Sequence, residues 1–200
     1  MIRDLDETLA KLLHDGAQAG SELKAAEISF ALPDATWRGL HPELTLNCYL
    51  YDIRQNAAMR TSEQIIVQSA DKKRAARVNP PARIDCAYCI TAWSGADAAN
   101  AIYEEHRLLS QALLILLQNP TIPPAALQGS LIGQLAPYPG IAASQEGVKN
   151  MPDFWNALDQ KLKPSLNYIV TLAMMVDKIP TDNEMVDVPG TITVGADHLT

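Results

Sequence analysis

Cys86 and Cys89, in the stretch ARIDCAYCITAWS, have the C-x-x-C spacing of zinc knuckles and of thiol redox pairs. The stretch is dominated by β-branched and aromatic residues, which predicts a strand. Strand residues three apart point to opposite faces and lie about 10 Å apart at ~3.3 Å per residue. A disulfide needs roughly 4.4 to 6.8 Å between its Cα atoms. We therefore expect two packed thiols here, and neither a metal site nor a redox pair.

A second chemistry is nucleophilic catalysis by Cys48 or Cys89 with His106 as the base. It requires one thiol that is exposed and of lowered pKa. His106 falls on an apolar helical stripe, where a histidine is more often packed and hydrogen-bonded than catalytic. The sequence has no Gly-rich phosphate loop, no H-E-x-x-H and no G-x-S-x-G. We expect no catalytic residue and no cofactor. Two alternatives stay open: a small cytoplasmic thiol or hydrolytic enzyme, and a plain adaptor module.

Composition limits the classes of protein that fit. The chain has 200 residues, 48% of them hydrophobic, which is enough for one well-buried core. Its net charge of −7 argues against a nucleic-acid partner. The one basic cluster, Lys72, Lys73, Arg74 and Arg77, is expected to be a solvated loop. The first 15 residues carry charges throughout, so we expect no signal peptide. The sequence has no apolar run of 18 or more residues, so we expect no membrane span and no membrane partner.

The periodicity of apolar residues predicts helices and strands in the order of an α+β domain. A mostly antiparallel sheet with helices packed on it is the expected fold, as one domain over residues 1–177 with a tail or arm over 178–200. The expected helices span 2–14, 96–118 and 152–161. The expected strands span 27–32, 44–53, 64–70, 82–94 and 166–176, with a further short strand near Leu131 in a long loop.

The long helix carries more apolar residues than one face can hold. A period of 3.6 residues places Ile102, His106, Leu109 and others on a stripe that would face the sheet. Leu108, Leu114 and Ile115 lie off that stripe. We expect these three side chains at or near a contact with another subunit or a partner.

The succession LTLNCYLYDI, NPPARIDCAYCITAWS, EEHRLLSQALLILLQNPTIP and MPDFWNALDQKLKPSLNYIVTLAMMVD resembles a known family. It is similar to the cap, or tail-terminator, proteins of bacterial extracellular contractile injection systems, which are phage-tail-like particles. The resemblance covers about Leu5 to Asp177. Its most specific parts are the strand that ends Thr91-Ala92-Trp93, the EHRLL helix after it, and the Phe154-Trp155 helix that leads to the last strand.

The resemblance implies a structural role and no catalytic residue. A homohexameric ring would seal the distal end of the inner tube, contact the last sheath ring and stop polymerisation, with the sheath and tube proteins as partners. The protein would be made in the cytoplasm and leave the cell as part of the particle. The tail after Asp177 is shorter than in some relatives, so no further surface-binding role is carried over.

The end of the chain contains a short β-prone run. Thr191, Ile192, Thr193 and Val194 follow an acidic, polar segment that resembles a linker. One interpretation is a frayed terminus. The other, which we hypothesise, is an arm that adds as an edge strand to a neighbouring cap subunit or to the sheath.

Overall fold

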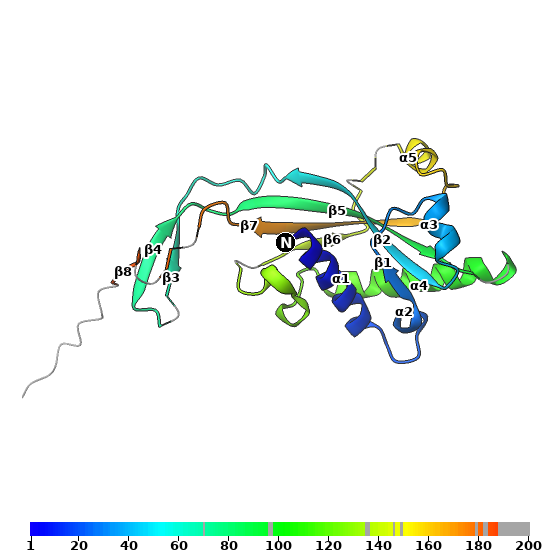
Figure 1. Cartoon of the computed structure of the whole chain (residues 1–200), viewed down its shortest axis with the longest axis horizontal. Helices are drawn as coiled ribbons and strands as arrows, with labels where there is room; N and C mark the ends of the chain where they lie inside the picture. Colours follow the sequence, from blue (N-terminus) through cyan, green and yellow to red (C-terminus); the bar gives the residue numbers. More distant parts are fainter. Residues whose placement is uncertain are drawn as a thin grey trace, which may run out of the picture.

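A five-stranded sheet with helices on both faces forms the body of the molecule, and a small second sheet projects from one end (Figure 1). The structure is a computed structural model. It describes residues 1–69, 71–95, 98–134, 137–145, 147–148, 150–178, 180–181 and 184–187.

The main sheet is mostly antiparallel, as the sequence predicts, with strand order β1-β2-β5-β7-β6. Only the short β1 pairs in parallel, with β2. The long β2, β5 and β7 supply the extended pairing, and β2 has a bulge between Leu50 and Asp52. The five strands are β1 (Glu27–Ser29), β2 (Thr45–Gln55), β5 (Ala82–Trp93), β6 (Gly140–Ala142) and β7 (Ser165–Met174). The short strand expected near Leu131 is wrong, because Leu131 ends a 3-10 turn and the strand is β6.

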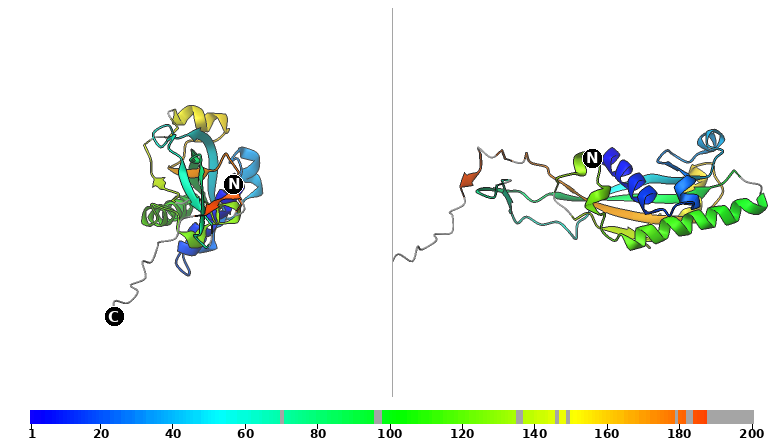
Figure 2. Two further views of the ribbon diagram at one scale, coloured as in Figure 1. Left: turned by 90° about the vertical axis from the view of Figure 1, so that its left-hand side faces the viewer. Right: turned by 90° about the horizontal axis from the view of Figure 1, so that it is seen from below.

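One face of the sheet carries the main core. The helices that cover it are α1 (Ile2–Gly16), α2 (Glu22–Ala25) and α4 (Ala98–Gln118), with α4 running along the body (Figure 2). Because side chains alternate along a strand, Cys86, Tyr88 and Ile90 of β5 all point into this core. They meet leucines of α1 and the buried side of α4. An added Cβ at Gly16 would lie 2.8 Å from a methyl group of Ile115, so α1 ends directly against α4.

The other face carries a smaller core at one end of the sheet. The helices α3 (Ala35–Leu40) and α5 (Met151–Ala157) bring Trp37 and Trp155 to Trp93 at the end of β5. The ring centres lie 5.5 Å apart for Trp37 and Trp93, and 6.4 Å apart for Trp93 and Trp155. This aromatic cluster fixes both short helices, which bury too little apolar surface to be stable alone.

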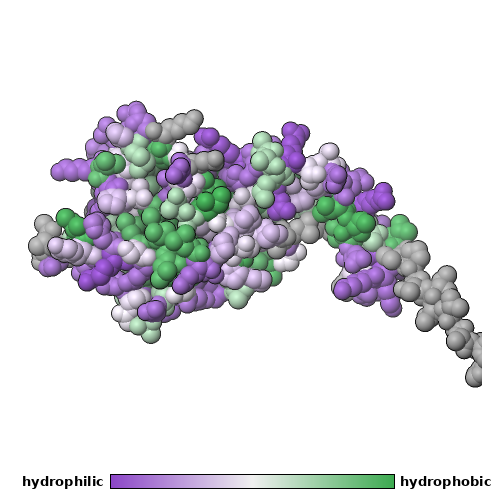
Figure 3. Space-filling model, turned by 180° about the vertical axis from the view of Figure 1, so that it is seen from behind, coloured by the Kyte–Doolittle hydropathy of each residue, from purple (hydrophilic) through white to green (hydrophobic). Residues whose placement is uncertain are grey.

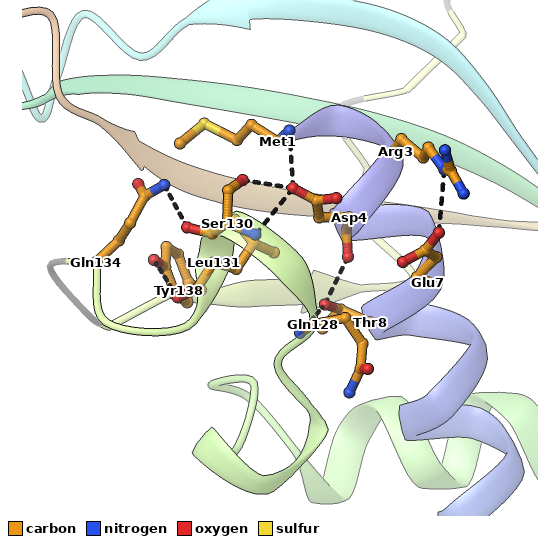
Figure 4. A network of polar contacts seen from close by, with 10 residues as sticks. All are labelled: Met1, Arg3, Asp4, Glu7, Thr8, Gln128, Ser130, Leu131, Gln134 and Tyr138. Carbon is orange, nitrogen blue, oxygen red and sulfur yellow. Dashed lines mark hydrogen bonds and ion pairs between the residues drawn. The ribbon is translucent and has the colours of Figure 1, made fainter.

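A polar network fastens the start of α1 to the 3-10 turns at Pro124–Ala126 and Gly129–Leu131 (Figure 4). The Asp4 carboxylate accepts hydrogen bonds from the Ser130 N–H (3.0 Å) and hydroxyl, and pairs with the terminal ammonium of Met1 at 2.9 Å. The Thr8 hydroxyl donates to the Asp4 carbonyl oxygen at 2.7 Å and accepts from the Gln128 N–H at 3.0 Å. These bonds hold the start of α1 in place.

The projecting sheet consists of β3 (Ile65–Gln68), β4 (Arg74–Val78) and β8 (Val186–Asp187), in the order β3-β4-β8. The prediction of a solvated loop for the whole basic cluster is therefore wrong: Lys72 and Lys73 lie in the turn, but Arg74 and Arg77 lie in β4. The alternation of Arg74-Ala75-Ala76-Arg77-Val78 is too weakly apolar to indicate a strand by itself. The segment is a strand because it pairs with β3 over four residues.

Candidate partner-binding surfaces

The outer face of α4 carries exposed leucines. Leu114 is 55% exposed, and Leu117 one turn later and Ile141 on β6 are exposed too. Viewed from behind, an apolar patch lies over the part of the body where α4 runs (Figure 3). We call Leu114, Leu117 and Ile141 the α4 patch. Such a patch is typical of a surface that a partner covers.

The phase of α4 differs from the expected stripe. Leu108 and Ile115, predicted to point away from the subunit's own core, are buried in it. Of the three candidate contact residues on this helix, only Leu114 is exposed. For Leu108 and Ile115, the prediction that the side chain points away from the subunit's own core is therefore wrong. For Leu114 the contact itself stays a prediction.

His106 lies on the outer face of α4, not in an apolar stripe. It lines a shallow hollow of ≈ 420 Å³ together with Tyr103, Arg107, Ser110 and Gln111. Ser110 is not activated there, because its hydroxyl donates to the His106 carbonyl oxygen at 2.7 Å, one helical turn back. Arg107 is paired with Glu22 at 2.8 Å. The hollow thus offers no nucleophile with a base beside it.

The three cysteines are free and buried. Cys48 and Cys86 point into the main core, while Cys89 shares the opposite face with Tyr49 and Asn167, its neighbours across β2 and β7. Burial raises the pKa of Cys86 and of Cys89 to about 11, and raises the pKa of Cys48 further. None of the thiols has the exposure or the lowered pKa that nucleophilic catalysis with His106 requires.

A larger hollow of ≈ 990 Å³ lies over the second face of the sheet, and the sequence analysis did not foresee it. Its walls include Tyr49, Tyr51, Asp85, Phe154 and Ile169. Asp85 already accepts hydrogen bonds from neutral donors, Asn56 at 3.0 Å and Thr171 at 2.6 Å. In the sequence, the alternation of β2 places Tyr49 and Tyr51 on one side of the strand, and this pattern could have indicated the wall of the hollow. Phe154 of α5 forms part of its wall, so the hollow depends on where that helix packs.

The remaining expectations concern the end of the chain, metals and membranes. Thr191, Ile192, Thr193 and Val194, expected to form an arm, lie outside the described residues. Within the described part of the chain, no group of three or more His, Cys, Asp or Glu side chains could hold a metal ion. No helix among the described residues is both long and apolar enough to cross a membrane.

Two solved structures share this fold. The sheath/tube terminator of the extracellular contractile injection system PVC, in its extended state, has a TM-score of 0.64 and 18% identity over 100% of this chain. The tube terminating cap of the anti-feeding prophage has a TM-score of 0.59 and 23% identity over 96% of this chain. This chain spans 64% and 61% of the lengths of those two chains.

Comparison by sequence is more specific about the family. No curated protein matches the chain. The model of the Pvc16 N-terminal domain matches residues 4–187, nearly the whole chain, and this confirms the resemblance seen in the sequence. The chain belongs to the Pvc16 N-terminal domain family.

Proposed function

We propose that this protein is a structural cap, which ends the inner tube and the sheath at the distal end of a contractile phage-tail-like particle. The observation that carries the proposal is the likeness of fold over the whole chain to two proteins described as terminators. The buried thiols of raised pKa and the exposed His106 support a structural role over an enzymatic one. The protein would be assembled into the particle in the cytoplasm and leave the cell with it.

The cap would be a closed homo-oligomer, a hexameric ring, in contact with the sheath protein and the inner tube protein. A head-to-tail contact that closes into a ring covers apolar surface on every subunit and leaves no growing end. The α4 patch is a candidate for such a contact, because Leu114 and Leu117 are exposed to water in the monomer and a contact would bury them.

Particles made without this protein test the cap role. Electron microscopy should show tubes and sheaths that lack the density closing the distal end, and particle lengths that are no longer uniform. Particles with normal ends and normal lengths would overturn the proposal. A plain adaptor, by contrast, need not close into a ring, and native mass spectrometry measures whether a ring forms.

Substitution of Leu114 tests the α4 patch. Leu114→Asp places a charge where we propose an apolar contact, so the ring should dissociate or fail to bind the particle. Ile132→Asp is the matched control, since Ile132 is a similarly exposed residue after the second 3-10 turn, outside the patch. A folded Leu114→Asp protein with unchanged oligomer mass and normal capping would show that the patch is not a contact.

We also propose the C-terminal arm, in which Thr191 to Val194 add as an edge strand to a neighbouring cap subunit or to the sheath. Its support is the β-prone sequence, and the position of β8, which pairs at Arg74 and Ala75 and precedes the arm in the sequence. Truncation after Asp187 keeps β8 and removes only the arm. Unchanged rings together with normally capped and sheathed particles would exclude this role.

A further inference from the structure

The projecting sheet has little support from its own chain. β3, β4 and β8 pack on one another and make no extensive contact with any other described helix or strand (Figure 1). A sheet of this size is marginally stable without an apolar face packed against something. Its structure therefore indicates that another surface covers it.

One face of this sheet carries exposed apolar residues and an arginine. Ile66 lies opposite Arg77 across the β3–β4 pair, and Val186 lies opposite Ala75 across β4 and β8, so these side chains share one face. Ile66 is 65% exposed and Val186 is 75% exposed. The alternate residues Ile65, Val67 and Val78 on the other face are half-buried or buried.

The charge of this hairpin is opposite to that of the rest of the protein. Residues 65–78 contain four basic residues and one acidic residue, a net charge of +3. The whole chain carries −7, so the remainder carries −10. The side chains of Lys72, Lys73 and Arg77 have no ion-pair or hydrogen-bond partner among the described residues. Lys73 lies near the carboxylate of Asp71, while Lys72 and Arg77 are cations without a direct partner in the described part of the chain, and such cations favour an acidic partner surface.

The other end of the molecule offers such a surface. The helix α3 and the start of β2 lie at the end of the body farthest from the projecting sheet (Figures 1 and 2). There Leu40 is 75% exposed, and the exposed Glu43 side chain has no partner among the described residues. Arg38 directs its guanidinium to the His41 and Ser94 carbonyl oxygens, so it forms no ion pair with Glu43. Within the described part of the molecule, this end thus presents an exposed leucine and an unpaired carboxylate, where the projecting sheet presents exposed apolar residues and an unpaired arginine.

We propose that the projecting sheet of one copy packs on the α3 end of the next copy, with Ile66 and Val186 against Leu40, and Arg77 beside Glu43. The inference rests on the proposed ring, and it names two surfaces that meet between neighbouring copies, in addition to the α4 patch. Because the two surfaces differ and lie at opposite ends, the contact is head-to-tail, as ring closure requires. Every copy then covers one projecting sheet and has its own sheet covered.

Charge reversal at the two ends tests this contact. Arg77→Glu and Glu43→Arg should each raise the concentration at which the ring dissociates by about tenfold or more, since each places like charges together. The double variant Arg77→Glu/Glu43→Arg restores opposite charges and should form rings again. So should an equimolar mixture of the two single variants, because alternating copies present opposite charges at every contact. Arg3→Glu, at an exposed position of α1, is the control for Arg77→Glu, because both lower the net charge by two.

Native mass spectrometry and sedimentation, with circular dichroism to confirm folding, give distinguishable outcomes. Loss of the ring in both single variants, with rescue in the double variant and in the mixture, supports the contact. Rings that survive both single reversals, or that fail to return in the double variant, overturn it and leave the cap proposal standing. A wild-type protein that is monomeric at all concentrations would overturn the ring itself, and this inference with it.

Discussion

The ammonium group of Lys163 lies 4.4 Å from the centre of the Trp93 ring and 2.6 Å from a carboxylate oxygen of Glu105. The two charged side chains are only 20% and 15% exposed, and Glu105 also accepts the Ser94 N–H at 3.1 Å. One cation thus links the end of β5, the first turns of α4 and the segment before β7. It holds the tryptophan cluster against the sheet.

Lys163→Met should destabilise the protein by about 2–3 kcal/mol, because it leaves the mostly buried Glu105 carboxylate without its cation. Chemical denaturation measures the loss. The double variant Glu105→Gln/Lys163→Met removes the orphaned charge and should recover part of it. Equal stability of wild type and Lys163→Met would show that the pair contributes nothing.

The acid stability of the protein should depend on Asp4. Hydrogen bonds from Ser130 hold the pKa of this carboxyl at about 2, below its ordinary 3.8. A group whose pKa is lower in the folded state stabilises the protein fully above the unfolded value and loses that effect as pH falls towards 2. Between pH 4 and 2 the thermal midpoint of the wild type should fall more than that of Asp4→Asn. Parallel pH profiles would contradict the assignment.

Gly129 lies in the left-handed region, with φ of 52°, and an added Cβ would lie 2.6 Å from Cγ of Asp4. Gly129→Ala should therefore destabilise the docking of α1 through both backbone strain and collision. Gly133→Ala is the matched control, since its φ is 82° but nothing lies within 4 Å of the new Cβ. We expect a cost of about 1–2 kcal/mol for the control, and a larger cost at Gly129. Equal costs in denaturant titrations would exclude the collision.

Leu108 and Leu114 should respond differently to truncation. Leu108 is fully buried in the main core, so Leu108→Ala should cost about 2–5 kcal/mol in the free energy of unfolding. Leu114→Ala should change the stability of the isolated subunit by no more than about 0.5 kcal/mol. Denaturation at a concentration where the protein is monomeric makes the comparison. A costly Leu114→Ala would contradict the phase of α4 described above.

All three thiols should resist a thiol reagent until the protein unfolds, because the thiolate is disfavoured in each buried site. Cys86→Ser places a hydroxyl in the apolar core and should cost about 1–3 kcal/mol. Cys89→Ser should cost less, since the Ser165 side chain, which lowers the pKa of this thiol, is a polar neighbour for the new hydroxyl. Rapid labelling of the native protein would instead revive the thiol-enzyme alternative.

The sequence by itself determined the class of fold and the separation of the two thiols. Long strands such as β2 and β5 alternate with a period of two residues, which no helix shares. Their positions along the chain could therefore be predicted without tertiary information. The same period puts Cys86 and Cys89 on opposite faces whatever packs against them. The family resemblance followed from the order and spacing of these elements.

The tertiary structure decided the phase of α4 and the shape of the projecting sheet. The last turns of α4 are apolar nearly all round, so the sequence allows several phases, and α1, packed beside the sheet, selects the one that buries Leu108 and Ile115. The strand β4 is weakly apolar and becomes a strand through its pairing with β3 and β8. Which apolar residues face solvent, and so which surfaces a partner can cover, depends on these long-range contacts.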